Sequence, residues 1–239
     1  MEFSFGIITA SSKQVLKIIE SIESMSIPKE KYEIIVVGGE NKYDNFSKVV
    51  HIPFDENSKP MWITRKKNEI TKNAKYENIV YLHDYFFFDP MWYKEFLVFG
   101  NDWDVCMNSI MNDGARYRDW CFFPGFLQNF PATQKKKDEL FGGGCFLLPY
   151  GVLNKHLYKY MYISGGYWVS KKRIMTKYPL DESLLWGQGE DVKWCKEIFS
   201  NEISYKVNSK SIVSIEGKVK QNIFAPIGEK HIEYLNSLK

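Results

Sequence analysis

The chain has 239 residues, of which 44% are hydrophobic and 26% are charged, and its formal net charge is +3. This length and composition are typical of one globular domain whose core needs neither disulfides nor a metal to hold it together. The small net charge gives no reason to expect a nucleic-acid partner. The four cysteines lie far apart without a Cys-x-x-Cys pair, which argues against a zinc site and against a disulfide framework.

The amino-terminal segment MEFSFGIITA lacks the basic region and the long apolar stretch of a signal peptide. No run approaches the roughly 20 apolar residues that are needed to cross a bilayer. We therefore expect a cytoplasmic protein without a transmembrane segment. The lysine run at residues 135–137 is most simply explained as a solvated loop, and contact with an anionic acceptor or with a membrane surface, as in a peripheral protein, stays open.

Strand-like and helix-like segments alternate along the first half of the chain. Ser11 and Gln14 have the spacing of a capping box, and apolar residues recur with helical spacing between residues 15 and 25. A second amphipathic helix is predicted over residues 62–74. Apolar runs rich in β-branched residues predict buried strands at residues 3–9, 33–37, 49–52 and 78–82. The alternation predicts an α/β fold with a mostly parallel central sheet that helices cover on both faces.

Polar residues follow three of these strands directly, at Thr9, at 38–40 and at 83–85. The carboxyl ends of parallel strands meet at one edge of a sheet, where ligands bind. We therefore expect these three segments to converge on one cleft.

The second half of the chain is less regular, and neither a repeat nor a linker divides it, so we expect a single domain over residues 1–239. In a helix that opens at Gly189, the residues Val192, Cys195 and Phe199 form the apolar stripe. The other expected elements are a strand at 104–109, a long aromatic-rich loop at 112–137, a glycine-rich turn or bulge at 142–144, a segment at 162–170 that leads into a helix, and a helix near 231–238.

A carboxylate pair, Glu190 and Asp191, follows the run Trp186-Gly-Gln-Gly189. Transfer of a sugar with inversion needs a base that takes the proton of the acceptor hydroxyl, and a carboxylate pair at the start of a helix suits this task. Trp186 offers a flat face for a sugar ring, and the glycines allow an acceptor to approach the backbone. The plainer explanation is that two acidic residues stabilise the amino-terminal end of the helix.

Asp84 directly follows a central strand, where a carboxylate can hold a divalent ion and thereby a diphosphate. Its plainer explanation is a turn or helix cap. His83-Asp84 is also similar to the pair of metal phosphohydrolases, but those enzymes need more histidines on helices than the four of this chain supply.

Arg65 and Asn68 lie one helical turn apart on one face. Arg65 could reach a phosphate or a base, although an exposed charged face explains it more simply. The pair Gly165-Gly166 indicates either an ordinary turn or a place where a ligand passes close to the main chain.

In this order the motifs resemble those of the GT-A glycosyltransferases, above all the inverting family 2 enzymes and the carboxyl half of the β-1,4-galactosyltransferase-like enzymes. The signature runs from Gly165-Gly166 through Tyr178-Pro-Leu-Asp181-Glu to Trp186-Gly-Gln-Gly-Glu190-Asp191, within a looser similarity over about residues 3–200. The resemblance implies one GT-A domain, with a nucleotide-binding half at about residues 1–105 and an acceptor and catalytic half at about residues 106–239.

The same resemblance implies that a sugar moves from a nucleotide-sugar donor, with a UDP-sugar favoured, to a hydroxyl of a glycan or a related acceptor. Asp191 would be the general base, and Glu190 would orient the acceptor. The residues implied around the nucleotide are Thr9, Ala10, Glu40, Arg65, Asn68 and Asp84. The residues implied at the sugar and acceptor sites are Gly165, Gly166, Trp168 and Trp186.

The chain departs from the family pattern at the metal motif, where His83-Asp84-Tyr85 stands in place of Asp-x-Asp. Asp84 is then the one carboxylate of the motif, and the late histidine His231 is the further ligand that the resemblance implies for Mn²⁺ or Mg²⁺. Glu40 also comes one or two places later than the acidic residue that the family has after its second strand.

Two alternatives stay open. A sugar nucleotidyltransferase usually has a glycine-rich loop with Arg and Lys after the first strand, where this chain has Thr9-Ala-Ser-Ser-Lys13, and the G-x-G-x-x-G of a dehydrogenase is missing there too. A catalytically inactive module that binds a nucleotide or a carbohydrate agrees with the incomplete metal motif, but the intact Glu190-Asp191 loop argues against it.

Overall fold

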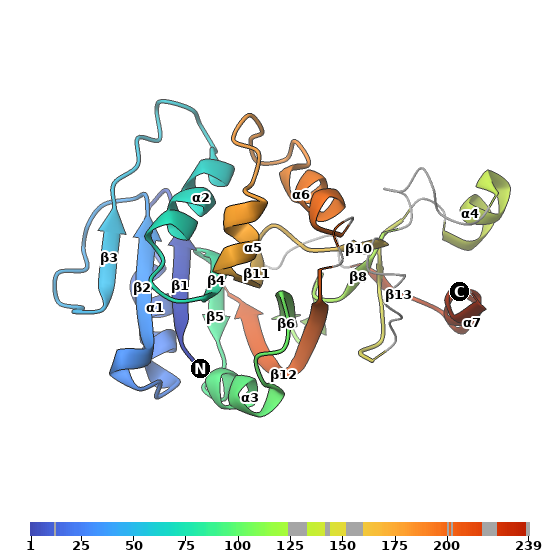
Figure 1. The fold of residues 1–239 in the computed structure, drawn as a ribbon, viewed down its shortest axis with the longest axis horizontal. Helices are drawn as coiled ribbons and strands as arrows, with labels where there is room; N and C mark the ends of the chain where they lie inside the picture. The colour runs from blue at the N-terminus through green and yellow to red at the C-terminus, as the bar shows by residue number, and fades with distance from the viewer. Residues whose placement is uncertain are drawn as a thin grey trace.

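A computed structural model of the chain describes residues 1–11, 13–123, 133–141, 144–151, 160–199, 201, 203–216 and 224–237. Within these ranges the strands form one sheet of nine and one sheet of four, with helices packed around them (Figure 1). The strands are β1 (Phe3–Ile8), β2 (Tyr32–Val37), β3 (Val49–Ile52), β4 (Asn78–His83), β5 (Phe86–Phe88), β6 (Val105–Asn112), β7 (Ala115–Arg116), β8 (Cys121–Phe122), β9 (Phe146–Leu147), β10 (Met161–Tyr162), β11 (Tyr167–Lys171), β12 (Tyr205–Ile215) and β13 (Ala225–Pro226). The helices are α1 (Val15–Ser24), α2 (Ile63–Asn73), α3 (Trp92–Phe99), α4 (Gln134–Phe141), α5 (Lys172–Lys177), α6 (Glu190–Phe199) and α7 (Glu229–Ser237), besides a 3₁₀ turn at Lys29–Lys31.

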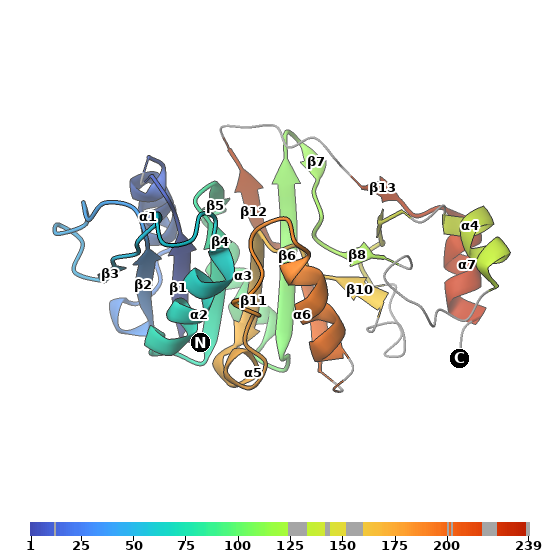
Figure 2. The same ribbon diagram turned by 90° about the horizontal axis from the view of Figure 1, so that it is seen from above.

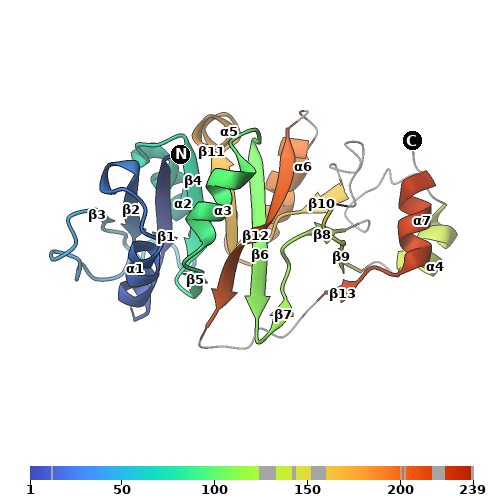
Figure 3. The same ribbon diagram turned by 90° about the horizontal axis from the view of Figure 1, so that it is seen from below.

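The large sheet has the order β3-β2-β1-β4-β11-β6-β12-β5, with β7 paired to β6. The strands β3, β2, β1 and β4 are mutually parallel, and every residue of β1 is buried. Helices α2, α5 and α6 lie on one face of this sheet, and α1 and α3 lie on the other (Figures 2 and 3). The predicted α/β architecture, with its four early strands and first two helices, is therefore confirmed.

The predicted capping box before α1 is wrong. The helix begins at Val15 with Gln14 as its N-cap residue, and no side chain caps it. The backbone N–H of Ser11 instead donates to the hydroxyl of Thr9 (3.2 Å). This bond ties the loop to the end of β1 before the helix starts.

The second half of the chain completes the same sheet. β11 runs antiparallel between β4 and β6, and β12 pairs parallel with β6. The strand expected at 104–109 is β6, and the segment expected to lead into a helix is β10, β11 and α5. The sequence analysis did not anticipate α3, β12 or the insertion of β11 beside β4.

The smaller sheet, with the order β10-β8-β9-β13, lies beside β6 and carries α4 and α7 at its outer end (Figure 1). The rings of Phe141 on α4 and Tyr234 on α7 are 6.2 Å apart. Part of the loop expected at 112–137 forms β7, β8 and the start of α4, so the lysine run 135–137 lies in a helix. Residues 124–132 and 142–143, which include two of the glycines expected at a turn, lie outside the described residues.

Helix α6 buries a different stripe from the one expected. Cys195 and Phe199 are buried as predicted, but Val192 is only half-buried. Trp194 takes its place and donates from its indole N–H to the carbonyl oxygen of Tyr178 (2.8 Å). This rotation turns the first residue of the helix, Glu190, towards the core.

One apolar core runs through both sheets, and none of the helices in the described ranges has the length and hydrophobicity to cross a membrane. Close packing leaves no room for a side chain where α2 crosses β1. A side-chain carbon added to Gly6 would overlap Ile70.

We predict that Gly6→Ala lowers the free energy of unfolding by about 1–3 kcal/mol, the usual cost of overpacking a core. In an Ile70→Ala background the same change should cost much less, because the clashing methyl groups are gone. Chemical denaturation of the four proteins of this cycle measures both effects. Equal costs in the two backgrounds would show that Gly6 and Ile70 are not in contact.

Candidate active site

A hollow of about 340 Å³ opens at the carboxyl ends of β1 and β4. The convergence predicted for Thr9 and residues 83–85 is therefore observed. Glu40 does not line the hollow: its side chain is exposed and pairs with Lys42 (2.8 Å). The lining residues are Ile8, Thr9, Ala10, Ser11, Glu56, Met61, Ile63, Lys66, His83, Asp84, Tyr85 and Trp186.

Thr9 and Asp84 form the floor of this hollow. The parallel register of β1 and β4 pairs Ile8 with His83, so the next residues of the two strands leave the sheet side by side. The hydroxyl of Thr9 donates to a carboxylate oxygen of Asp84 (2.6 Å). The two residues that the sequence placed around a nucleotide thus share one hydrogen bond at the strand ends.

Lys66 is a charged residue of the hollow that the sequence analysis did not single out. Its ammonium is buried, donates to the carbonyl oxygen of Thr9 (2.7 Å) and pairs with Glu56. A cation at the strand ends suits an anionic ligand. Helical spacing could have found it, because the inward face of α2 recurs at Ile63, Lys66, Ile70 and Ala74.

Asp191 lies at the start of α6, with its carboxylate held in one orientation. One oxygen accepts the hydroxyl of Tyr162 (2.6 Å) and the backbone N–H of Gly165 (3.0 Å). The other accepts the N–H of Val192 (2.8 Å). Burial, and after it the charge of Asp191, raises the pKa of Tyr162 far above its ordinary value. The phenol therefore stays protonated and continues to donate to Asp191.

The pair Gly165-Gly166 connects Asp191 to the hollow. A side-chain carbon on Gly165 would come 3.0 Å from the Asp191 carboxylate, and one on Gly166 would come 3.0 Å from the hydroxyl of Tyr85. The carbonyl oxygen of Gly166 also accepts the N–H of His83 (3.0 Å). One peptide unit, about 3.8 Å between its Cα atoms, thus separates the wall of the hollow from the carboxylate.

Glu190 and Lys67 are two buried charged residues close to Asp191. Glu190 is 6% exposed and Lys67 is 1% exposed. Burial is the main reason that the pKa of Glu190 is raised. Burial also lowers the pKa of Lys67 to about 8, although the negative charges of Asp191 and Glu190 act in the opposite direction.

Trp186 lines the hollow and is 56% exposed, as a residue that offers its ring to a ligand should be. The loop that carries Trp186 contacts Met61, which also lines the hollow. The backbone N–H of Trp186 donates to the carbonyl oxygen of Met61 (3.2 Å). This loop leads directly into Glu190 and Asp191 at the start of α6.

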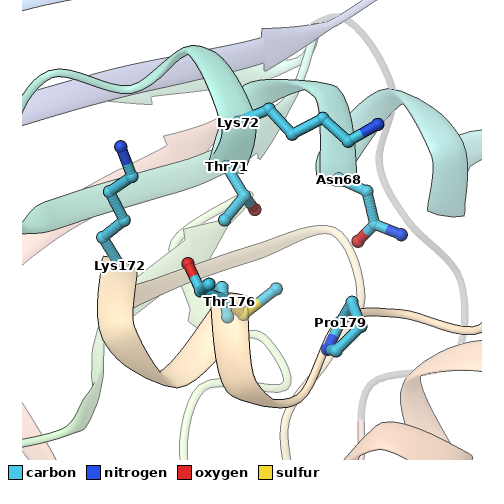
Figure 4. Close-up of a pocket in the computed structure, with 7 residues that line it drawn as sticks. Asn68, Thr71, Lys72, Lys172, Thr176 and Pro179 are labelled. Atoms are coloured by element: carbon cyan, nitrogen blue, oxygen red, sulfur yellow. The ribbon is translucent and has the colours of Figure 1, made fainter.

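Arg65 and Asn68 hold this loop and do not line the hollow. Arg65 pairs with Glu182 (2.8 Å), while the Asn68 side chain donates to Glu182 and to the carbonyl oxygen of Leu180 (both 2.9 Å). Asn68 lies instead at a second hollow of about 410 Å³ between α2 and α5 (Figure 4). The expectation that both residues contact the nucleotide is therefore wrong, because their polar groups are used within the protein.

Trp168 is a core residue, contrary to the expectation that it shapes the sugar site. It is 2% exposed and stacks on Tyr81, with ring centroids 4.8 Å apart. On β11 it is covered further by Trp194 of α6, at 5.3 Å. The rings of Trp168 and Trp194 thus form part of the packing between the sheet and α6.

His231 lies on α7, at the opposite end of the molecule from β1 and β4 (Figure 1). Its Nδ1 accepts the N–H of Gly228 (3.2 Å), and its Nε2 lies within hydrogen-bonding distance of the carbonyl oxygen of Leu140. The expectation that His231 and Asp84 hold one metal ion is therefore wrong.

A divalent ion fits the hollow only together with a ligand. No three His, Cys, Asp or Glu side chains gather as a metal site anywhere in the described part of the chain. Asp84 lines the hollow, but the nearby Glu56 is paired with Lys66. Mg²⁺ often binds one or two carboxylates and completes its shell with water and substrate phosphates. Asp84 is thus suited to an ion that arrives with a diphosphate.

We predict that Glu190→Gln keeps or raises the thermal stability at pH 7–8. A raised pKa means that the folded protein favours the protonated form of Glu190 over the ionised form. The stability that the protonated form contributes is therefore lost as the pH rises through that pKa. The advantage of the variant should shrink towards pH 4, where Glu190 is protonated. Melting curves across pH test this, with the exposed Glu197→Gln of the same helix as control. A variant much less stable than the wild type at pH 7 would contradict it.

No protein-family model matches the chain, and no curated protein matches its sequence. Its structure is similar to that of S. aureus TarS residues 1–349, with a TM-score of 0.57 at 15% identity over 95% of this chain and 60% of that one. The same protein in complex with UDP-GlcNAc gives 0.55 at 15% identity (98% and 61%), and in complex with UDP 0.54 at 14% (98% and 62%). The chain thus spans about 60% of the length of these proteins. At such identities the likeness shows the fold alone, and that fold is the GT-A glycosyltransferase fold that the motifs predicted.

Proposed function

We propose that this chain is an inverting glycosyltransferase, which moves a sugar from a nucleotide-sugar donor, a UDP-sugar, to a hydroxyl of a glycan acceptor. The observation that carries the proposal is the placement of two carboxylates, Asp84 in the hollow at the strand ends and Asp191 behind Gly165-Gly166. A structurally similar protein of the same fold binds UDP and UDP-GlcNAc, which supports a nucleotide-sugar donor.

The donor would bind in the hollow, with its diphosphate near Asp84 and Lys66. A divalent ion, Mn²⁺ or Mg²⁺, would be held by Asp84 and the phosphates and would offset the negative charge of the diphosphate. The ammonium of Lys66, which also pairs with Glu56, is already in place at the strand ends, and a donor fixed in this way stabilises a departing anion without rearrangement. Thr9 orients the carboxylate of Asp84 through its hydroxyl.

The acceptor hydroxyl would lie between the sugar and Asp191, which takes its proton. Tyr162 and Gly165 fix the direction of the carboxylate, so the base needs no rearrangement before the reaction. Trp186 provides a ring at the rim on which a sugar can stack, and Glu190 would orient the acceptor from the first turn of α6. With the base and the leaving group on different sides of the sugar, the new bond forms with inversion.

The test of the function itself is release of UDP from a panel of UDP-sugars, with and without Mn²⁺. Release from one of these sugars, stimulated by an acceptor glycan, is the expected result. Donor binding without any turnover would favour an inactive binding module, and pyrophosphate formation would favour a nucleotidyltransferase.

We predict that Asp191→Asn lowers turnover by about two to four orders of magnitude, the usual contribution of a general base, while UDP affinity stays the same. Steady-state kinetics and calorimetry measure the two quantities. Asp102→Asn is the matched control, because that side chain is fully exposed and pairs with the surface residue Lys206. Turnover of the Asp191 variant at the wild-type level would remove the base assignment.

We predict that Asp84→Ala abolishes the part of UDP affinity that depends on Mn²⁺ or Mg²⁺. Lys66→Met should instead weaken UDP binding equally with and without the ion, because its charge acts independently of the metal. Calorimetry on the wild type and both variants separates the two. Identical UDP affinity of the wild type with and without metal would contradict a metal role for Asp84.

A further inference from the structure

Lys67 places a cation inside the protein, directly beneath the glycine pair. It extends from the inward side of α2 and is 1% exposed. Its ammonium donates to the carbonyl oxygen of Gly165 and lies 4.7 Å from the centre of the Trp168 ring. Burying an ammonium costs free energy unless hydrogen bonds or opposite charges compensate for it. An apolar side chain would fill this space at lower cost, so the charge itself calls for an explanation.

Gly165 bonds to Lys67 and to Asp191 at once. Its carbonyl oxygen accepts from Lys67 and its N–H donates to Asp191 (3.0 Å). The two groups belong to adjacent peptide units, which are joined at the Cα of Gly165 by two rotatable bonds. Because glycine restricts these bonds little, the hydrogen bond from Lys67 limits the rotation of the turn on its carbonyl side. Gly165 is thus the single residue between the ammonium and the carboxylate of Asp191.

Lys67 also acts on Asp191 and Glu190 through its charge. These two carboxylates raise the pKa of Lys67 against the effect of burial. Burial raises the pKa of Glu190, and the charge of Lys67 acts against that rise. The titratable groups that surround this cluster on the neighbouring elements are Tyr162 of β10, Tyr81 of β4, Cys195 of α6 and His83 at the end of β4.

We propose that Lys67 is a positioning residue of the active site, whose ammonium fixes the Gly165 peptide that orients Asp191 and whose positive charge offsets the nearby negative charges of Glu190 and Asp191. This inference rests on the proposed function and adds a residue to it. Lys67 does not line the hollow. It acts on Asp191 through the Gly165 peptide and through its charge.

Lys171 is a natural control for this proposal. It is a second buried lysine, 4% exposed, its pKa is also lowered to about 8, chiefly by burial, and its ammonium lies 3.9 Å from the centre of the Trp103 ring. Its hydrogen bonds go to the amide oxygens of Asn78 and Asn101, at the end of β11 remote from Gly165-Gly166. Replacing it removes a buried cation without removing a contact of the site.

We predict that Lys67→Met lowers kcat by about 10- to 100-fold, the effect of a misplaced catalytic group, with the KM for the donor and the affinity for UDP within about twofold of the wild type. Lys171→Met should lose comparable stability and leave kcat near the wild-type value. Equal losses of kcat in the two variants would overturn the proposal, and so would an effect of Lys67→Met on KM alone.

A second readout covers the case in which Lys67→Met does not fold. Because the pKa of Lys67 is about 8, its charge is present below that pH and lost above it, so wild-type kcat should fall above pH 8. Lys67→Arg keeps its charge at every accessible pH and should lack this fall. A wild-type kcat that stays level to pH 9.5 would contradict the proposal.

The two proposals can fail separately. If the wild type transfers no sugar from any UDP-sugar, the proposed function fails. The carboxyl ¹³C chemical shift of Asp191 at neutral pH, assigned with Asp191→Asn, still tests Lys67 without any activity. A chemical shift that changes in Lys67→Met and stays in Lys171→Met supports the positioning role, and equal chemical shifts in all three proteins exclude it.

Discussion

The site depends on one backbone turn, Gly165-Gly166, and on the hydrogen bonds that hold it. Its carbonyl groups accept from Lys67 and from the N–H of His83, and its first N–H donates to Asp191. A side chain on either glycine would meet Asp191 or Tyr85 at 3.0 Å. The absence of side chains at this turn is therefore what allows the carboxylate of α6 to approach the strand ends of the sheet.

Helix α2 contributes two neighbouring buried cations with different tasks. Lys66 points to the end of β1 and bonds to Thr9, while Lys67 bonds to Gly165. Arg65 and Asn68 of the same helix hold the loop that leads to Trp186. One short helix thus connects the proposed donor side, the turn and the acceptor loop. Buried charges of this kind reduce stability, and they are expected where chemistry requires them.

Part of this arrangement could be predicted from the sequence. The strands up to β4 are continuous apolar runs, so their place in a parallel sheet, and with it the meeting of Thr9 and Asp84, follows from local pattern. The place of β11 in the sheet cannot be predicted in this way. The strand contains Lys171, and a lysine indicates a surface position unless its partners Asn78 and Asn101 are known. Trp168 shows the opposite error, because a core residue was expected at the sugar site. An aromatic residue shortly after a glycine pair is compatible with either place. The roles of Arg65 and Asn68 depend on a loop more than 100 residues away in the chain, which no local pattern contains.

The central claim is that a nucleoside diphosphate binds at the ends of β1 and β4, within reach of Asp191. A crystal structure of the protein with UDP and Mn²⁺ tests it most directly. We expect the diphosphate to lie beside Asp84 and Lys66. The Asp191 carboxylate should face the β-phosphate, on the side where the sugar of a donor would be attached, across Gly165-Gly166. UDP bound in the hollow between α2 and α5, or bound with Asp191 turned away from it, would contradict the account.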